Sequence, residues 1–291
     1  MTIFEQIPEI RAKIADLKKE NLRIGLVPTM GALHNGHLSL LHYAKKECDI
    51  VVCSIFVNPS QFNNRKDFEN YPRHFEKDLA MLEREGCDIV FSPSEKELYK
   101  NISMTSVTVK EISEEMEGKF RPGHFDGVGL IVCKLFNIIH PDFAYFGQKD
   151  LQQYLIINQI VEDLSFPITL RCLPIVREAG GLAMSSRNQR LSNEDKEKAQ
   201  VLYKLLVEAG QKLMDGQQIS EVKYYVDHSL KKVDGVTLEY FEAVNVETLK
   251  PLSEISSYEE VALCIASYVG EVRLIDNIFL SEIRENANRS I

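Results

Sequence analysis

The sequence predicts an α/β fold, with a parallel β-sheet in the first part of the chain and a smaller α+β domain after it. Short runs rich in β-branched residues alternate with helical periodicity over residues 1–176. These runs are apolar throughout, which is typical of strands with helices packed on both faces of the sheet. At 291 residues the chain is also longer than one hydrophobic core usually serves, so we expect two domains.

The first domain carries strand and helix signals in βαβ order. The predicted strands are residues 22–27, 50–57, 87–91, 142–146 and 167–176. The predicted helices are residues 36–47, 75–85, 128–139 and 151–163. Strands joined by helices in this way predict a Rossmann-like parallel sheet.

The character of the sequence changes after residue 176. A long charged helix is expected to begin at Ser192, where Ser192 and Asp195 form a capping box. A further helix and three alternating strands follow at 221–232, 237–244, 261–269 and 272–279. A tight turn at Gly270 suits an antiparallel hairpin between the last two strands. We therefore expect domains at 1–176 and 177–291.

Composition excludes several classes of partner. A formal net charge of -9 argues against nucleic acid, because phosphate backbones are held by clustered Lys and Arg. The N-terminal segment, residues 1–19, lacks the unbroken apolar centre of a signal peptide. The longest apolar stretch, residues 128–139, contains Lys134 and is too short to span a bilayer, so no membrane partner is expected.

The six cysteines are scattered singly, without a C-x-x-C pair. Most lie inside apolar segments, which is typical of buried free thiols in a reducing compartment. We therefore expect a cytoplasmic protein.

The segment Leu26–His37 joins a predicted strand to a predicted helix through two glycines and two histidines. Glycine lets backbone approach a ligand closely, and a helix N-terminus offers unpaired N–H groups and a positive dipole end to an anion. His34 and His37 lie three residues apart, so both face the same side of the opening turn and can donate to phosphate oxygens. The segment predicts a nucleotide-phosphate site.

Two other interpretations of this histidine pair stay open. A single histidine at a strand–helix junction is usually a helix cap or a solvated surface group. His-x-x-His can also bind zinc, although no Cys, Asp or further His lies close by in the sequence to complete the ligand set.

Two more clusters directly follow predicted strands, where ligands bind in open α/β sheets. Gln61 follows the strand at 50–57 and can both donate and accept hydrogen bonds; the alternative is a loop amide that faces solvent. Lys149 and Asp150 follow the strand at 142–146, where the lysine can neutralise phosphate charge. The alternative for this cluster is helix capping beside a solvated lysine.

Two loops complete the set of candidate segments. Residues 184–188 place two hydroxyls and a guanidinium in a flexible loop after glycines, which suits a phosphate clamp. Residues 117–128 form a glycine-rich loop of mixed charge that covers a site or simply makes a turn.

Six blocks in this order resemble the pantothenate synthetase family, and the match runs from about residue 22 to about residue 190. The blocks are Pro28-Thr29-Met30-Gly31 with His34-x-Gly36-His37, Asn58-Pro59-x-Gln61-Phe62, Tyr71-Pro72-Arg73, Arg121-Pro122-Gly123-His124-Phe125, Gly147-x-Lys149-Asp150-x-Gln152-Gln153 and Met184-Ser185-Ser186-Arg187-Asn188. The H-x-G-H block alone would indicate only the wider nucleotidyltransferase superfamily.

The resemblance implies an ATP-dependent ligase that joins pantoate to β-alanine and releases AMP and pyrophosphate. The pantoate carboxylate is expected to attack the α-phosphate, and the β-alanine amine then attacks the pantoyl adenylate. A carboxylate is a poor acylating agent at neutral pH, and AMP supplies the leaving group it needs. The family also implies a homodimer, and a second domain that closes over the ATP site. Magnesium is implied by the phosphate chemistry, without a carboxylate cage visible in the sequence.

The resemblance also assigns site residues. His37 takes the proton-donor position, although an imidazole at a helix N-terminus resists protonation, so His34 and His37 are expected mainly to hydrogen-bond and orient the phosphates, with Lys149 stabilising charge. Gln61 and Gln153 match the pantoate-binding amides, and Gln61 also borders the β-alanine position. The expected ATP contacts are Met30, Gly31, Ala32, Leu33, His34, Asn35, Gly36, His37, Gly147, Gln148, Lys149, Asp150, Val176, Met184, Ser185, Ser186 and Arg187.

One departure from the family pattern is visible. Gly180 stands where the family usually has an acid before Gly181, which is expected to loosen that loop. Two competing functions are a nucleotidylyltransferase with a phosphorylated acceptor and a non-catalytic nucleotide-binding module. The paired glutamines favour a small hydroxy acid over the first, and the intact His37, Lys149 and Arg187 argue against the second.

Overall fold

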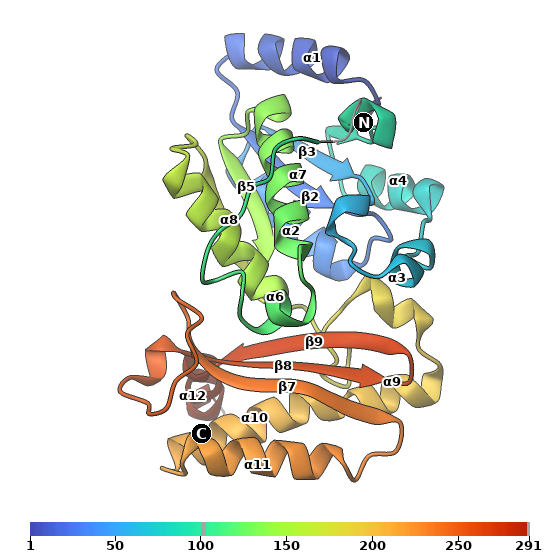
Figure 1. The fold of residues 1–291 in the computed structure, drawn as a ribbon. Helices are drawn as coiled ribbons and strands as arrows, with labels where there is room; N and C mark the ends of the chain where they lie inside the picture. Colours follow the sequence, from blue (N-terminus) through green and yellow to red (C-terminus); the bar gives the residue numbers. More distant parts are fainter. Residues whose placement is uncertain (100–102, 290–291) are drawn as a thin grey trace. The chain divides into compact units, whose positions relative to one another are not determined.

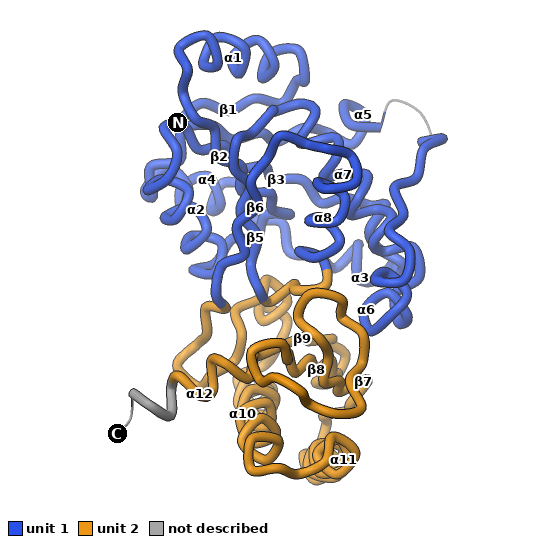
Figure 2. Tube along the Cα trace, turned by 90° about the vertical axis from the view of Figure 1, so that its left-hand side faces the viewer, with its two compact units in different colours: residues 1–148, 153–174 blue, residues 149–152, 175–291 orange. Residues whose placement is uncertain are grey.

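The computed structural model describes residues 1–99 and 103–289, with backbone alone from 286 to 289. The chain divides into two compact units, coloured separately in Figure 2. The first unit contains Met1–Gln148 and Gln153–Pro174, and the second contains Lys149–Gln152 and Ile175–Ile291.

A six-stranded parallel sheet forms the centre of the first unit, in the order β1-β4-β3-β2-β5-β6 (Figure 1). Its strands are β1 (Thr2–Phe4), β2 (Ile24–Thr29), β3 (Ile50–Ile55), β4 (Ile89–Phe91), β5 (Phe143–Gly147) and β6 (Thr169–Leu173). The parallel sheet and the five predicted strands are confirmed, each strand with slightly different ends. Strand β1 was not predicted, because three residues before a helix carry no readable periodicity.

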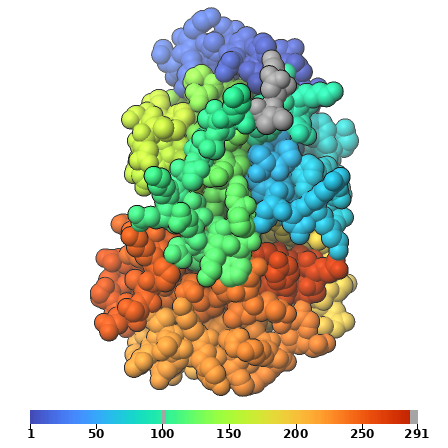
Figure 3. Space-filling model, viewed as in Figure 1, coloured from blue at the N-terminus to red at the C-terminus, as the bar shows by residue number. Residues whose placement is uncertain are grey.

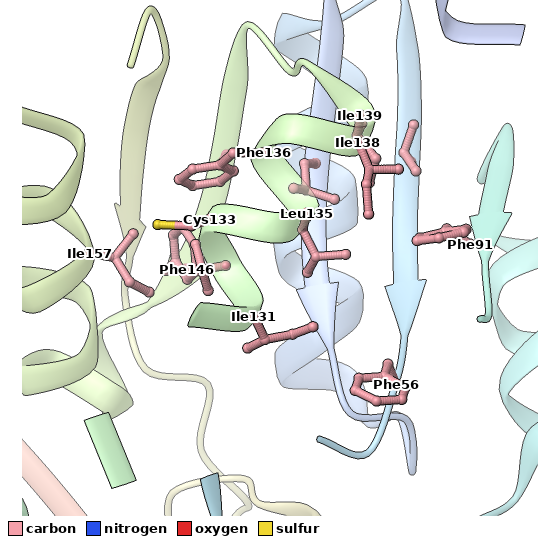
Figure 4. Close-up of a cluster of buried hydrophobic side chains, with 14 of the residues drawn as sticks. Phe56, Phe91, Ile131, Cys133, Leu135, Phe136, Ile138, Ile139, Phe146 and Ile157 are labelled. Atoms are coloured by element: carbon pink, nitrogen blue, oxygen red, sulfur yellow. The ribbon is translucent and has the colours of Figure 1, made fainter. Parts of the chain in front are cut away.

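Helices cover both faces of this sheet, which explains why its strands are apolar without alternation. On one face pack α1 (Ile7–Lys19), α7 (His124–Ile139) and α8 (Leu151–Asp163). On the other pack α2 (Asn35–Glu47) and α4 (Phe75–Arg84). Successive strand residues point to opposite faces of the sheet. Leu26 therefore packs in the hydrophobic cluster with α1, α7 and α8, and Val27 packs in the cluster with α2 and α4. Figure 4 shows the cluster on the α7 side of the sheet, with Phe136 of α7, Phe146 of β5 and Ile157 of α8.

The topology of the sheet places its ligand-binding edge. Strand β2 lies between β3 and β5, and the chain continues from β2 through α2 to β3 on one side while β5 lies on the other. Loops that leave β2 and β5 therefore diverge, which is the switch point at which open parallel sheets bind ligands beyond the carboxyl ends of their strands. Residues 30–37 leave β2 there, and Gln148 follows β5.

Short elements fill the connections of this unit. They are η1 (Pro59–Gln61), α3 (Arg65–Glu69), α5 (Glu95–Leu98), α6 (Met116–Phe120) and η2 (Gln148–Asp150). In Figure 3 the green segment before α7 runs across the visible face of this unit. Helix α7 begins four residues earlier than predicted, because Gly123 and Gly127 make the residues before 128 resemble a loop in the sequence.

The second unit contains a three-stranded antiparallel sheet, β7 (Val236–Asn245), β8 (Val261–Val269) and β9 (Val272–Phe279). Its other elements are η3 (Ser186–Arg190), α9 (Asn193–Ala199), α10 (Val201–Met214), α11 (Ile219–Leu230), η4 (Tyr258–Glu260) and α12 (Leu280–Arg289). The predicted α+β character and the hairpin are confirmed, and Gly270 takes a φ of 56° at the turn.

The charged helix predicted after Ser192 is two helices, because the chain breaks at Gln200 between α9 and α10. The Ser192 hydroxyl does cap α9 and accepts the Asp195 N–H at 3.1 Å. The second half of the predicted capping box differs, since the Asp195 carboxylate accepts from the Ser192 hydroxyl at 2.8 Å. All six cysteines are free thiols. Among the described residues, every helix is too short or too polar to cross a lipid bilayer.

Candidate active site

The turn after β2 has an unusual backbone. Gly31 and Ala32 both take left-handed conformations, with φ of 77° and 49°. Glycine adopts this region without strain, whereas alanine does so only when its surroundings hold it there. The Thr29 hydroxyl accepts the Gly31 N–H at 3.1 Å and donates to the Ser54 oxygen of β3 at 2.7 Å. The start of the turn is thus tied to the sheet.

A buried carboxylate holds the next two residues of the turn. Asp78 of α4 is 2% exposed, and its two oxygens accept the N–H groups of Ala32 and Leu33, each at 2.8 Å. Asp78 was not among the site residues predicted from the sequence. The available signal is a charged residue four positions before the buried Leu82, on the apolar face of an amphipathic helix.

The two histidines cap the helix that follows. His34 is the N-cap of α2, and its Nδ1 accepts the Gly36 N–H at 3.1 Å. The His37 Nδ1 accepts the backbone N–H of His34 at 3.3 Å, and the ring centroids lie 4.0 Å apart. A ring nitrogen that accepts a hydrogen bond carries no proton, so in the neutral imidazoles the proton is on Nε2. Each ring therefore has Nε2–H as its donor.

This arrangement changes which groups of the turn can meet an anion. The sequence suggested unpaired backbone N–H groups, but most of them are engaged within the first unit. Gly31 donates to a hydroxyl, Ala32 and Leu33 to a carboxylate, and His34 and Gly36 to imidazole nitrogens. An anion at this turn would therefore meet the Nε2–H edges of the imidazoles and the positive end of the α2 dipole.

The segment after β3 fixes the orientation of Gln61. The Asn58 side-chain amide donates to the Gln61 Oε1 at 3.1 Å and to the Gly127 oxygen at 3.1 Å. With its oxygen engaged, Gln61 has its amide nitrogen as donor, and that nitrogen lies 3.0 Å from the Met30 sulfur. Gln61 is 7% exposed, so the alternative of a solvent-facing loop amide is wrong. Asn58 was not among the site residues predicted from the sequence.

Residues 117–128, predicted as a glycine-rich loop, instead lie mostly in α6 and in the first residues of α7, and they pack against this segment. The buried His124 ring lies 2.6 Å from the Gln61 main-chain oxygen through Nδ1. A side chain at Gly127 would meet the Ser60 oxygen at 2.3 Å, so only glycine permits this approach. The first turn of α7 therefore supports the backbone that carries Gln61.

Two predicted residues lie at the carboxyl end of β5 and one in the first turns of α8. Gly147 ends β5 and Gln148, which is 5% exposed, follows it. Gln153 is partly buried on α8. These three belong to the first unit together with Met30–His37 and Gln61.

The second unit holds the remaining predicted residues, beginning with Lys149 and Asp150 in η2. The Lys149 ammonium lies 3.8 Å from the Asp150 carboxylate, and its side chain is 17% exposed, so it is not a fully solvated lysine. The Asn277 side chain of β9 donates to the Lys149 main-chain oxygen at 3.0 Å.

Residues 176–184 form a hydrogen-bonded hairpin, and the predicted flexible loop at 184–188 instead runs into η3. Met184 N–H donates to the Val176 oxygen at 3.0 Å, and Glu178 N–H to the Leu182 oxygen at 2.8 Å. Gly181 takes a φ of 89° at the tip. Ser185 then caps η3 and accepts the Arg187 N–H at 3.3 Å, and the next residue, Ser186, is buried.

Arg177 anchors this hairpin to β9. Its guanidinium donates to Asp276 at 2.6 Å, to the Gly181 oxygen at 3.1 Å and to the Asn277 oxygen at 3.1 Å. It also lies 3.9 Å from the centre of the Tyr203 ring. Burial raises the pKa of the Asp276 carboxyl, and the hydrogen bond from Arg177 opposes that rise.

The glycine that departs from the family pattern is packed rather than loose. A Cβ at Gly180 would meet the Gln200 side chain, with its Cδ only 2.1 Å away. Gln200 therefore occupies the space that a side chain at residue 180 would need. Asn188 supports the same hairpin, because its amide donates to Glu178 at 3.0 Å and to the Ala183 oxygen at 3.1 Å.

The described residues offer little to a protein-bound metal. Within 1–99 and 103–289, no group of three or more His, Cys, Asp or Glu side chains is arranged to hold an ion. Zinc binds a ring nitrogen that carries no proton. In both histidines Nδ1 accepts a backbone N–H and Nε2 carries the proton, so this arrangement does not suit zinc.

Comparison with known proteins places this arrangement among ligases. The family model described as Pantoate-beta-alanine ligase matches residues 2–279. The pantothenate synthetase of Caldicellulosiruptor bescii is 47% identical over 279 residues, which cover 96% of this chain and 98% of that protein. The pantothenate synthetase of Thermoanaerobacter sp. is 46% identical over 283 residues, covering 97% and 99%.

Solved structures of proteins with these names also superpose on this chain. A crystal structure of pantothenate synthetase from Thermus thermophilus superposes with a TM-score of 0.90 at 39% identity, covering 96% of this chain and 99% of that one. A crystal structure of pantoate-beta-alanine ligase from Francisella tularensis, complexed with beta-gamma ATP and beta-alanine, has a TM-score of 0.81 at 36% identity, with 97% and 98% coverage.

Proposed function

The chain belongs to the pantoate–beta-alanine ligase family and is an enzyme of pantothenate formation, and we propose that it drives this condensation with ATP through a pantoyl adenylate. The observation that carries the proposal is the pair of imidazoles at the N-terminus of α2, both anchored through Nδ1, in a chain that matches the family from residue 2 to 279. The ATP and beta-alanine named in the Francisella ligase complex support the nucleotide and the amine.

The proposed reaction has two steps. In the first, a pantoate carboxylate oxygen attacks the α-phosphorus, an O–P bond forms, and the bond to pyrophosphate breaks. In the second, the neutral β-alanine amine attacks the acyl carbon, a C–N bond forms, and AMP leaves with the electrons of the broken C–O bond. The amine proton goes to solvent or to a nearby base. Formation of the mixed anhydride supplies the leaving group that a carboxylate lacks.

In the first unit, His34 and His37 are proposed to donate Nε2–H hydrogen bonds to phosphate oxygens. Neutral donors suit this position, because a proton on Nδ1 would break the backbone cap that each ring makes. The positive end of the α2 dipole favours the same anion. Stabilising the charge that develops on the leaving pyrophosphate would speed the first step.

Gln61 is proposed to bind pantoate through its amide nitrogen, together with Gln153, and to border the position of β-alanine. Support for Gln61 comes from the Asn58 hydrogen bond, which engages the amide oxygen and so sets the nitrogen as donor toward a hydroxyl or carboxylate oxygen.

The second unit is proposed to supply positive charge and hydroxyl donors to the triphosphate. Lys149 and Arg187 carry the charge, and Ser185 and Ser186 the hydroxyls. The other proposed ATP contacts are Met30, Gly31, Ala32, Leu33, Asn35, Gly36, Gly147, Gln148, Asp150, Val176 and Met184. A homodimer and cytoplasmic residence stay predictions, and sedimentation of the purified protein would test the first.

Magnesium is proposed to arrive as part of the nucleotide substrate. Mg²⁺ prefers oxygen ligands and keeps several waters, so phosphate oxygens and water suffice to hold it. The donors described around the α2 turn are imidazole nitrogens and amides, and the Asp78 carboxylate is occupied by backbone N–H groups. These residues fit a nucleotide-borne ion better than one held by a protein cage.

Isotope exchange tests the adenylate. Protein with ATP, magnesium and pantoate, but without β-alanine, is expected to exchange labelled pyrophosphate into ATP. Omitting pantoate is the matched control and should abolish exchange. A folded sample that binds ATP yet shows no pantoate-dependent exchange, or that forms ADP and orthophosphate, would contradict the proposal.

A further inference from the structure

We propose that Asp78 is a positioning residue for the reaction: its buried carboxylate holds the Gly31–Leu33 turn and so sets the two imidazoles of α2. The expected effect of Asp78 on catalysis rests on the proposed function. Its effect on the tautomers of His34 and His37 is a property of the protein without substrates and is tested separately.

The contacts of Asp78 are specific to the turn. Each carboxylate oxygen accepts one backbone N–H, Oδ1 from Leu33 and Oδ2 from Ala32, both at 2.8 Å. The residue is 2% exposed, so these bonds replace the water that a carboxylate otherwise binds. Hydrogen bonds to an ionised acceptor are stronger than those between neutral groups. A single side chain thereby fixes two successive peptide units.

The turn needs such a partner because of its backbone conformation. Ala32 has a φ of 49°, which alanine adopts only under constraint. The turn also approaches α4 closely, since a Cβ at Gly31 would lie 3.0 Å from the Asp78 Oδ2. Without the carboxylate, two buried N–H groups would lose their acceptor and the strained peptide would be expected to relax.

A short path leads from this turn to the rings. Leu33 directly precedes His34, whose own N–H donates to the His37 Nδ1 at 3.3 Å. The His34 Nδ1 in turn accepts the Gly36 N–H at 3.1 Å. A change in the peptide planes at Ala32 and Leu33 would therefore alter the cap that fixes the tautomer and direction of both imidazoles.

The alternative is that Asp78 only stabilises the fold. Leu82 lies one turn later on α4 and is 2% exposed. It packs in the hydrophobic cluster between the sheet and the helices α2 and α4. Truncating Leu82 removes core contacts from the same helix but leaves the acceptor of the Ala32 and Leu33 N–H groups in place. Leu82→Ala is therefore the matched control for lost stability.

The experiment compares Asp78→Asn with Leu82→Ala in protein labelled with ¹⁵N-histidine and without substrates. Wild type and Leu82→Ala should show His34 and His37 as Nε2–H tautomers. Asn offers one acceptor oxygen and sets an amide N–H against the second backbone donor, so Asp78→Asn should shift at least one ring away from that tautomer. Pantoate-dependent pyrophosphate exchange should fall about 100-fold in Asp78→Asn, with the KM for pantoate changed less than about threefold.

Rescue at Ala32 provides a second test. Glycine adopts the left-handed conformation without strain, so Ala32→Gly should restore part of the exchange rate lost in Asp78→Asn. This double variant is the sample to use where Asp78→Asn alone does not fold. Wild-type tautomers and a wild-type exchange rate in folded Asp78→Asn would overturn the proposal. Where only the double variant folds, tautomers and an exchange rate equal to those of Ala32→Gly alone would overturn it. If wild-type protein shows no exchange but the tautomers respond as expected, the proposed function fails and the positioning role stands.

Discussion

The side-chain amide of Asn277 donates to the main-chain oxygen of Lys149 over 3.0 Å, although the two residues lie 128 positions apart. Asn277 is 3% exposed on β9, and its neighbour Asp276 binds Arg177 of the hairpin at 2.6 Å. Within the second unit, two adjacent residues of one strand therefore hold both segments that carry the proposed phosphate-binding side chains.

Asn277→Ala is expected to lower pyrophosphate exchange about tenfold, because the loss of one buried hydrogen bond frees the Lys149 peptide while leaving its ammonium in place. The measurement is the exchange rate at saturating ATP. Ser267→Ala on β8 is the control, since Ser267 is equally buried and its hydroxyl has no hydrogen-bond partner in the described part of the chain. Equal activity in the two variants would contradict a role for Asn277.

Lys149→Ala should reduce the exchange rate on the order of 100-fold, because it removes a charge proposed to act on the leaving pyrophosphate. Stability should change little, since the ion pair of the ammonium with Asp150 is long, at 3.8 Å. Lys204→Ala, an exposed lysine of the same unit, serves as control for lost net charge. Normal turnover by folded Lys149→Ala would show that the assigned role is wrong.

The pH dependence of stability should report on Glu47. Hydrogen bonds from Arg171 hold the pKa of the Glu47 carboxyl below its usual value of 4.5. The folded carboxylate therefore binds its proton more weakly than the unfolded one, so its contribution is present above pH 4.5 and is lost as the pH falls through the folded pKa. Because the pair is partly exposed, Glu47→Gln should lower the unfolding free energy at pH 7 by at most about 1 kcal/mol.

Denaturant unfolding at pH 7 and at pH 3 checks this, with the difference between wild type and Glu47→Gln expected to narrow at pH 3. A difference of the same size at both values would mean that packing, and not the charge of Glu47, accounts for the effect.

Gly180→Asp introduces the acid that the resemblance led us to expect at this position, and it should destabilise this chain. Its Cβ would meet the Gln200 Cδ at 2.1 Å, so the glutamine must leave its position. A flexible side chain can move, and we expect a loss of about 1 kcal/mol. Thermal unfolding of Gly180→Asp and of Gly180→Asp with Gln200→Ala measures it, and the double variant should regain most of the loss. No recovery would show that Gln200 is not the cause.

The sequence predicted the elements whose signals are local and left out those that depend on distant partners. Strands such as Ile50–Ile55 are apolar on both faces, and this pattern requires no knowledge of the tertiary fold. Strand Thr2–Phe4 exists only because it pairs with Ile89–Phe91, and nothing in three residues reveals that pairing. The break at Gln200 was likewise invisible in a continuous helical pattern.

The same reason explains which site residues were missed. His34 and His37 lie where a predicted strand leads into a predicted helix, Lys149 lies just after another strand, and all three match blocks of the family pattern. Asp78 lies 46 positions from Ala32 and acts on its backbone, which leaves no mark on the local sequence at either end. Buried polar side chains that hold a loop can be recognised only once the packing is known.

His37→Asn separates the two uses of the His37 ring. The Asn Oδ1 can take the place of Nδ1 and accept the His34 N–H, so the cap of α2 should persist and the unfolding free energy should fall by less than about 1 kcal/mol. The variant has no counterpart of Nε2–H, so pyrophosphate exchange should drop on the order of 100-fold. His37→Gln carries its amide nitrogen further out and should recover part of that rate, although it weakens the cap. If folded His37→Asn exchanges pyrophosphate like wild type, the ring acts in the turn alone and the proposed donor lies elsewhere.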